Sequence, residues 1–238
     1  MVCFKIYKCI YKGFAAIEGD GCMKDIYNIG LIRVVTLNDD RLLNIHGKII
    51  EKYFPMLKVE SKCIADQPYG IYDEETEKIA VPKIIELAKN WTNIDALIIS
   101  CAGDPAVEEL RETLDIPVIG AGESTALLAK SYGEVFGVLG ITKEVPKAYT
   151  EILGDSIVGT NDVPGIETTI DLMTQEGRKK VIKKALELKT LGAEVIALAC
   201  TGMATIGIAR ELEVVCGIPV IDPVVAEGLI TYCKCIRK

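Results

Sequence analysis

Two cysteines occupy equivalent positions in an internal repeat, and they are the residues best placed to do chemistry. The segment Asp-Ala-Leu-Ile-Ile-Ser-Cys-Ala-Gly at residues 95–103 aligns with Glu-Val-Ile-Ala-Leu-Ala-Cys-Thr-Gly at residues 194–202. An Arg-Glu pair follows each cysteine at the same offset, and Ile-Pro-Val-Ile follows in both copies after a slip of three residues. A repeat of this length predicts two similar lobes, one carrying Cys101 and the other Cys200.

Each of these cysteines is expected at the carboxyl end of a buried strand, just before a helix, where parallel α/β sheets bind ligands. The helix N-terminus is expected to lower the thiol pKa and to attract a carboxylate or enolate oxygen. Inversion of a carbon centre needs a base on one face and an acid on the other, and two equivalent thiols can exchange those roles. Because a single strand-end cysteine is more often a small buried apolar residue, the hypothesis depends on the pairing.

Short apolar runs alternate with helical patterns from residue 26 onward. The predicted strands cover residues 29–37, 57–64, 96–100, 117–120, 135–141, 156–158, 195–199 and 219–221. The predicted helices cover residues 39–54, 73–89, 105–114, 124–131, 145–153, 174–191, 205–214 and 223–234, with Asn38 as the expected N-cap of the first. Repeated βα units of this kind predict a parallel α/β fold.

The repeat also predicts the domain organisation. The chain is expected to cross between the lobes near residues 119–120 and 221–222, so that residues 26–119 plus 222–238 form the first α/β lobe and residues 120–221 the second. Residues 1–25 have no clear period and are set apart as an N-terminal extension. A translation start placed too early would explain them, and so would an added edge strand or tail.

Composition excludes several classes of protein. Half of the 238 residues are apolar, which is enough for a sizeable core, and the net charge of −7 argues against nucleic-acid binding. No apolar run reaches the ~18 residues of a membrane span, so no membrane partner is expected. Nine scattered cysteines without a Cys-x-x-Cys pair, and a single histidine, His46, argue against a zinc site and favour a reducing cytoplasm. His46 is expected to be structural.

The residues around both cysteines resemble the aspartate/glutamate/hydantoin racemases, most closely the hydantoin racemase branch. Ser-Cys-Ala-Gly-Asp-Pro at residues 100–105 resembles the first cysteine motif of that branch, and Ala-Cys-Thr-Gly-Met at residues 199–203 resembles the second. Gly-Val-Leu-Gly-Ile-Thr at residues 137–142 looks like the family's central strand and the threonine-containing turn after it. The resemblance covers roughly residues 26–238, and its paired cysteine motifs are specific.

The resemblance implies two flavodoxin-like parallel-sheet lobes, related by a pseudo-twofold axis and facing each other over a cleft. It implies a racemase or epimerase that needs no pyridoxal phosphate or metal, with Cys101 and Cys200 as the acid/base thiols. The substrate would be an amino acid or a derivative such as a 5-substituted hydantoin, and a homo-oligomer is the expected assembly. Backbone and hydroxyl donors to its carboxylate or ring carbonyl are expected from Ala102, Gly103, Thr142, Thr201 and Gly202.

Three further candidates lie where the chain departs from the family pattern. Glutamate racemases have Asp-Ser after the first strand and Cys-Thr-His at the second cysteine, and many hydantoin racemases have Asn-Pro-Asn after strand one. This chain has Val-Thr-Leu-Asn at residues 35–38 and Cys-Thr-Gly at residues 200–202. Thr36 or Asn38 is the candidate substitute, unless they are a strand residue and a helix cap. Glu123 either touches substrate or offsets a helix dipole.

Three alternatives stay open. Maleate isomerases share the architecture and keep two cysteines, whereas arylmalonate decarboxylases share it and use one, which the matched pair disfavours. A two-lobed protein that clamps a small acid without turnover would require neither cysteine. A thiol redox enzyme is disfavoured because no Cys-x-x-Cys pair is present.

Overall fold

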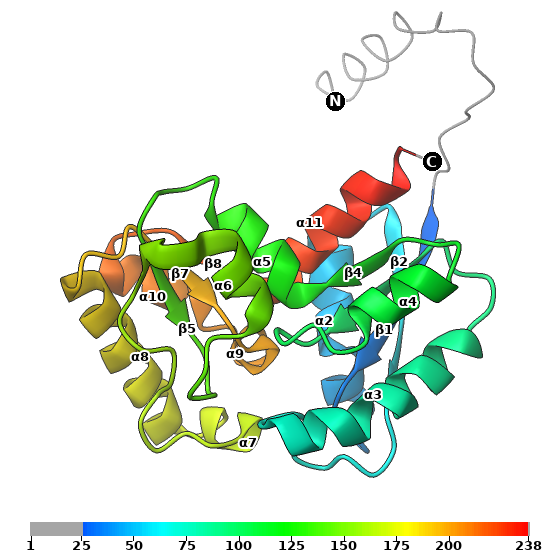
Figure 1. Cartoon of the computed structure of the whole chain (residues 1–238), viewed down its shortest axis with the longest axis horizontal. Helices are drawn as coiled ribbons and strands as arrows, with labels where there is room; N and C mark the ends of the chain where they lie inside the picture. Colours follow the sequence, from blue (N-terminus) through cyan, green and yellow to red (C-terminus); the bar gives the residue numbers. More distant parts are fainter. Residues whose placement is uncertain (1–25, 238) are drawn as a thin grey trace, which may run out of the picture.

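The computed structural model describes residues 26–237 and shows two parallel sheets, one in each half of the molecule (Figure 1). The first sheet has the order β2-β1-β3-β4 and consists of β1 (Tyr27–Arg33), β2 (Leu57–Cys63), β3 (Ala96–Ser100) and β4 (Val118–Gly120). The second has the order β6-β5-β7-β8 and consists of β5 (Phe136–Leu139), β6 (Ile157–Val158), β7 (Val195–Leu198) and β8 (Val220–Ile221). The two orders are the same, so the predicted α/β fold with two parallel-sheet lobes is confirmed. The N-terminal extension, residues 1–25, lies outside the described residues.

Helices flank both sheets. They are α2 (Asp40–Tyr53), α3 (Glu74–Lys89), α4 (Val107–Thr113), α5 (Ala121–Ala129), α6 (Lys147–Leu153), α7 (Thr169–Leu172), α8 (Gln175–Thr190), α9 (Thr201–Thr205), α10 (Ala209–Cys216) and α11 (Pro223–Cys235), with one 3-10 turn, η1 (Gly154–Ser156). Among residues 26–237, no helix is both long and apolar enough to cross a membrane.

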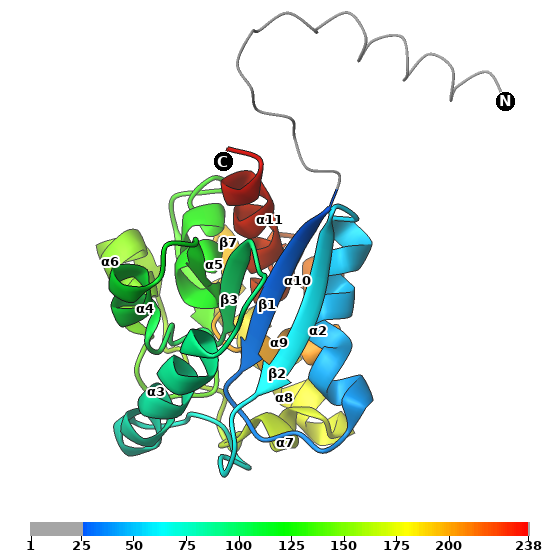
Figure 2. The same cartoon turned by 90° about the vertical axis from the view of Figure 1, so that its right-hand side faces the viewer.

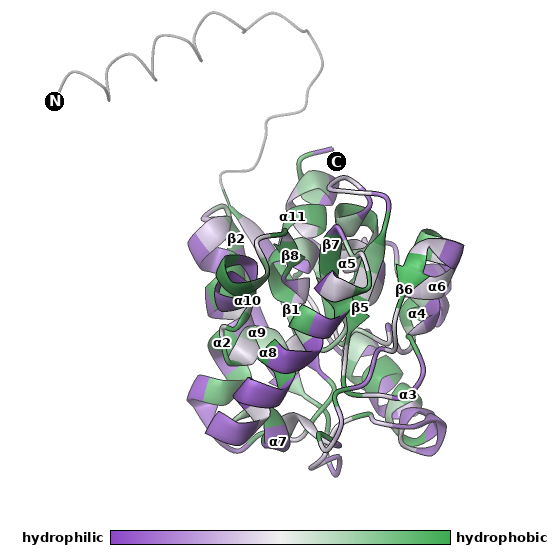
Figure 3. Ribbon diagram, turned by 90° about the vertical axis from the view of Figure 1, so that its left-hand side faces the viewer, coloured by the Kyte–Doolittle hydropathy of each residue, from purple (hydrophilic) through white to green (hydrophobic). Residues whose placement is uncertain are grey.

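The first sheet is covered on both faces, which explains its apolar strands. Every residue of β3 is buried, so Ala-Leu-Ile-Ile-Ser shows no alternation of polar and apolar residues. Ile99 packs on the side of α3 and α4, whereas Ile98 packs on the side of α2 and α11. Figure 2 shows α3 and α4 on one side of β1 and β3, and α2 on the other. In the second lobe, α8 turns hydrophilic residues outward over a hydrophobic interior (Figure 3).

Local capping chemistry sets the helix starts. Asp39 caps α2 by accepting a hydrogen bond from the Arg41 backbone N–H, so the expectation that Asn38 would be the cap is wrong by one residue. Asp73 and Thr76 form a capping box at the start of α3, and Asp222 caps α11 just before Pro223.

The helix after the last strand of each sheet contacts the other half of the molecule. Strand β4 pairs with β3 in the first sheet, yet α5 packs on α6 and β7 of the second lobe. Strand β8 pairs with β7, yet α11 packs on α2 and β3 of the first lobe. These two connections join the lobes at the floor of the cleft. The lobe boundaries drawn from the sequence, at residues 119/120 and 221/222, stay a prediction and lie at these connections.

Candidate active site

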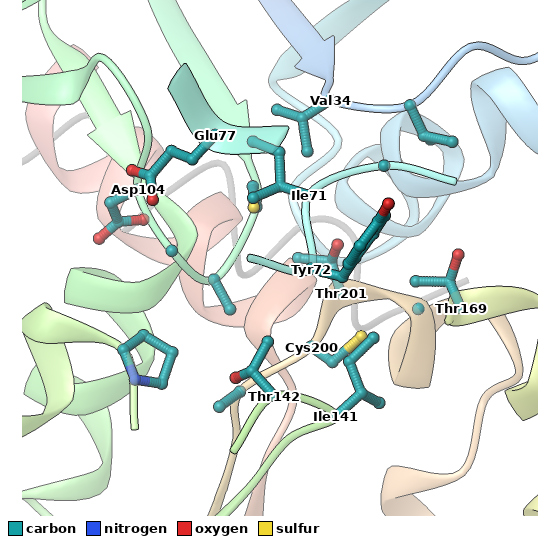
Figure 4. Close-up of a pocket in the computed structure, with 18 of the residues that line it drawn as sticks. Val34, Ile71, Tyr72, Glu77, Asp104, Ile141, Thr142, Thr169, Cys200 and Thr201 are labelled. Atoms are coloured by element: carbon teal, nitrogen blue, oxygen red, sulfur yellow. The ribbon is translucent and has the colours of Figure 1, made fainter. Parts of the chain in front are cut away.

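A cleft between the two lobes receives the carboxyl ends of strands from both sheets. It has a volume of about 1470 Å³ and is lined by Cys101 after β3 and by Cys200 after β7. Figure 4 places Val34 and Ile71 of the first lobe opposite Thr142 and Cys200 of the second. Ligand pockets usually measure roughly 300–1,000 Å³, so this cleft is wider than one small substrate needs.

The backbone directly after each of the two cysteines has a different conformation. Cys200 is the N-cap of α9 without a side-chain capping hydrogen bond, and the nearby backbone N–H groups of Gly202 and Met203 act to lower its thiol pKa. Cys101 is followed by a turn, and α4 begins at Val107, two residues later than the predicted start at residue 105. The Gly103 N–H acts to lower the pKa of Cys101.

Burial has the largest effect on the pKa of both thiols. It raises the pKa of Cys101 to about 12 and the pKa of Cys200 to about 11, because a thiolate loses its hydration in the protein interior. The backbone N–H groups act in the opposite direction and offset only part of this shift. The expectation that a helix N-terminus would bring the thiols toward neutral pKa is therefore wrong for the ligand-free protein, and both sulfurs carry protons at pH 7.

This protonation state predicts how fast the thiols are alkylated. Since only the thiolate attacks, the rate of reaction of Cys101 and Cys200 with iodoacetamide should rise about tenfold for each pH unit between pH 7 and 9. Peptide mapping by mass spectrometry measures each site separately. A rate that levels off below pH 8 would show that the N–H groups outweigh burial.

The predicted hydroxyl donors line the cleft, but they already have partners inside the protein. The Thr201 hydroxyl donates to the Ser100 carbonyl at 3.3 Å, across the junction between the lobes. The Thr142 hydroxyl donates to the Glu144 carbonyl at 2.9 Å and accepts from Asn161 at 3.2 Å. Ala102, Gly103 and Gly202 also line the cleft, as expected.

The structure places the three remaining candidates, Thr36, Asn38 and Glu123, in different surroundings. Thr36 lines the cleft, but its hydroxyl donates to the Ile64 carbonyl at 2.9 Å and accepts from the Gln67 N–H at 2.7 Å, so it holds a neighbouring loop. Asn38 is exposed and is not among the lining residues, so the structure does not bring it to the cysteines. Glu123 lines the cleft and forms an ion pair with Arg111.

Asp104 is a site residue that the sequence reasoning missed. It follows Cys101 by three residues, and its carboxylate accepts from the backbone N–H groups of Gly122 at 2.7 Å and Glu123 at 2.6 Å. Asp104 therefore caps α5, the role that the dipole argument gave to Glu123. A Cβ on Gly122 would overlap the Ala102 carbonyl oxygen, so glycine is required where the Cys101 turn meets α5. The Cys-Ala-Gly-Asp spacing was visible in the sequence, but its partner at residue 122 was not.

Burial raises the pKa of Asp104 to about 7, and this predicts a pH-dependent stability. Between about pH 4 and pH 7 the folded protein keeps a proton that the unfolded chain has released. The free energy of unfolding should therefore fall as the pH rises through this window, by at most about 1.4 kcal/mol per unit, and this contribution should be constant above pH 7. Urea unfolding of wild type and Asp104→Asn at pH 5 and pH 7 isolates the effect as a difference between the two slopes. Parallel slopes would contradict the raised pKa.

A buried polar network lies beneath both cysteines. His46 is fully buried, with Nδ1 2.8 Å from the Ser100 hydroxyl and Nε2 2.9 Å from the Thr205 hydroxyl. The Ser100 hydroxyl donates to Glu227 Oε1 at 2.7 Å. Burial holds the pKa of His46 well below its usual range, so the ring is neutral. Ser100 precedes Cys101 and Thr205 ends the helix that Cys200 caps, so His46 joins the two cysteine segments.

Metal binding was not expected from the sequence. Within residues 26–237, no group of three or more His, Cys, Asp or Glu side chains is arranged to hold a metal ion.

Comparison with known proteins gives one consistent family. The model of the Asp/Glu/Hydantoin racemase family matches residues 46–227. The hydantoin racemase of Pseudomonas sp. (strain NS671) is 34% identical over 175 residues, which are 67% of this chain and 66% of that enzyme. The hydantoin racemase of Paenarthrobacter aurescens is 31% identical over 175 residues, 68% of this chain and 72% of that enzyme. The chain thus spans about two thirds of the length of these relatives.

Solved structures agree on the fold. Allantoin racemase from Pseudomonas fluorescens aligns with a TM-score of 0.75 at 18% identity, covering 87% of this chain and 89% of that one. A glutamate racemase from Bacillus anthracis aligns with a TM-score of 0.63 at 18% identity, covering 88% and 82%. The family match over most of the chain and the shared two-lobed fold lead to one conclusion: the chain belongs to the Asp/Glu/hydantoin racemase family.

Proposed function

We propose that this protein is a cofactor-independent racemase or epimerase of an amino acid or an amino-acid derivative, with Cys101 and Cys200 as its acid/base pair. The observation that supports this most is the placement of the two cysteines. They end the equivalent strands β3 and β7 of two sheets with the same strand order, and both line one cleft. The hydantoin racemase relatives support the reaction class.

In the proposed reaction, one thiol first gives its proton to solvent, and its thiolate then removes the proton from the carbon next to a carbonyl. The other thiol delivers its proton to the opposite face and becomes the thiolate. The C–H electron pair moves onto the carbonyl oxygen as an enolate and returns to carbon when the second proton arrives. Because burial raises both thiol pKa values, to about 12 and about 11, either thiolate is a strong base and the pair is nearly balanced. Such a balance suits a reaction whose two directions are equivalent.

The test is a panel of enantiopure amino acids and 5-substituted hydantoins incubated with the protein in deuterated water. We expect at least one substrate to lose optical rotation while its α-proton is replaced by deuterium, both before and after exhaustive dialysis against chelator. A variant with both cysteines changed to serine is the control for non-enzymatic exchange. If no compound exchanges its α-proton above that control, the proposal is wrong.

A further inference from the structure

Arg33 is a buried cation at the floor of the cleft. It is the last residue of β1, it pairs in register with Ser100 of β3, and it lines the same cleft as both cysteines. Its side chain is anchored through one nitrogen, which donates to the carbonyls of Leu42 at 2.7 Å and Leu43 at 3.5 Å. The residue is only 7% exposed, so its charge is largely removed from water.

This charge has no direct ion-pair partner in the described part of the chain. None of the ion pairs among residues 26–237 includes Arg33. Glu227 acts on the guanidinium electrostatically without forming an ion pair with it, and burial raises the pKa of Glu227 well above its usual range. Burial also raises the pKa of both cysteines, to about 12 and about 11. Burial lowers the pKa of Arg33 to about 10, so the guanidinium remains charged at pH 7.

The other cations that line the cleft are not both buried and without an ion-pair partner. Arg111 is half-exposed and forms an ion pair with Glu123, and Lys147 is largely exposed and lies 3.3 Å from Glu108. Lys143 also lines the cleft, but it is exposed, so water solvates its charge. A buried charge without a counter-ion is costly and persists where something else compensates for it. Arg33 lines the cleft, where a charged ligand could supply this compensation.

We propose that Arg33 is the anion-binding residue of the cleft and that the substrates are small carboxylates rather than neutral rings. This inference rests on the proposed racemase function and names its substrate class. A carboxylate on the carbon that is inverted would bring the countercharge next to both sulfurs. When the C–H bond breaks, the electron pair moves into that carboxylate as an enediolate, and the guanidinium offsets the added negative charge.

Two alkylating reagents test the charge preference without a known substrate. Iodoacetate and iodoacetamide have the same reactive carbon and nearly the same size, but only iodoacetate is an anion. We expect the ratio of their rates at Cys101 and Cys200 to fall about tenfold in Arg33→Met, since a charge-assisted contact is worth that factor or more. Arg33→Lys should keep part of the preference. Lys147→Gln, which removes an exposed and already paired cation from the cleft rim, should leave the ratio unchanged, and Cys233 is the internal control outside the cleft.

Two outcomes would overturn the proposal. If Arg33→Met slows both reagents by the same factor, Arg33 acts on the thiols alone and binds no anion. If neither rate changes in Arg33→Met, the charge is not felt in the cleft. We expect the variant to fold, because the Leu42 and Leu43 carbonyls lie inside α2, where intrahelical hydrogen bonds also use them. A melting temperature within a few degrees of wild type checks this.

Calorimetry with a matched pair of ligands gives an independent measurement. N-carbamoyl-L-alanine and 5-methylhydantoin have the same carbon skeleton, but only the open form carries a carboxylate. We expect the open form to bind wild type more tightly, and its dissociation constant to rise about tenfold or more in Arg33→Met while that of the ring is unchanged. Tighter binding of the ring to wild type would contradict the inference. Neither measurement needs turnover, so a protein that prefers carboxylates through Arg33 but exchanges no α-proton would refute the racemase function and leave the anion site standing.

Discussion

Racemisation should fall by a factor on the order of 10³ or more in both Cys101→Ser and Cys200→Ser, because every turnover needs one base and one acid. A serine hydroxyl is too weak an acid or base to replace a thiol on either face. Each variant nevertheless keeps one sulfur, which can remove the proton from one enantiomer only. One variant should therefore exchange deuterium into the D form and the other into the L form, without inversion in either case.

Proton NMR of the α-position, together with polarimetry in deuterated water, measures both parts of this prediction. Cys233→Ser is the matched control, since Cys233 is half-buried in α11 and does not line the cleft. An enzyme with decarboxylase-like chemistry would be inactivated by one substitution and hardly affected by the other. If both serine variants racemise at nearly the wild-type rate, Cys101 and Cys200 are not the acid/base pair.

Replacement of His46 by leucine should lower the free energy of unfolding by about 3 kcal/mol. Leucine has a similar volume, but it leaves the hydroxyls of Ser100 and Thr205 without their imidazole partner, and an unsatisfied buried polar group costs about 1–3 kcal/mol. Ser100 is fully buried, so it should account for the larger share although it keeps its bond to Glu227. Thr205 is half-buried, lines the cleft and keeps a 3.5 Å bond to the Thr201 carbonyl. Urea unfolding followed by circular dichroism gives the value.

The same substitution should slow deuterium exchange into the D and the L enantiomer alike, because His46 joins the segments of both cysteines rather than serving one of them. Thr205→Val is the matched partner: it removes one hydroxyl at constant volume, and the double variant with His46→Leu completes a double-mutant cycle. A coupling energy near zero would show that the bond between His46 and Thr205 contributes nothing. A loss of exchange confined to one enantiomer would assign His46 to a single thiol instead.

Much of the fold could be predicted from the sequence, because strands and helices depend on the local pattern of polar and apolar residues. The run Ala-Leu-Ile-Ile-Ser predicted β3 at the residues where it lies, since a strand covered on both faces must be apolar throughout. The boundaries were less exact where a turn replaced a regular element. The segment after Cys101 contains Asp104 and Ala106 in the left-handed region, at φ values of 54° and 61°, and the helix was predicted too early there.

Helix α9 shows the same limit in the second lobe. No helix was predicted over residues 201–204, and the predicted helix began at residue 205. Thr-Gly-Met-Ala-Thr has weak helix propensity. Packing overrides that propensity, since Met203 and Ala204 are buried in the cores of different lobes. The N–H groups that act to lower the pKa of Cys200 come from this helix.

The sequence by itself determined the two-lobed parallel fold and the pair of cysteines, because strand periodicity and an internal repeat are properties of local order along the chain. Only the tertiary structure decided the protonation of those cysteines, because the pKa of a thiol depends on how much water surrounding elements exclude, and burial outweighed the helix terminus. The tertiary structure also brought together Arg33, His46 and Glu227, which come from β1, α2 and α11. These residues are separated by up to 194 positions in the chain (227 − 33), and no local pattern encodes a contact or a charge balance over that distance.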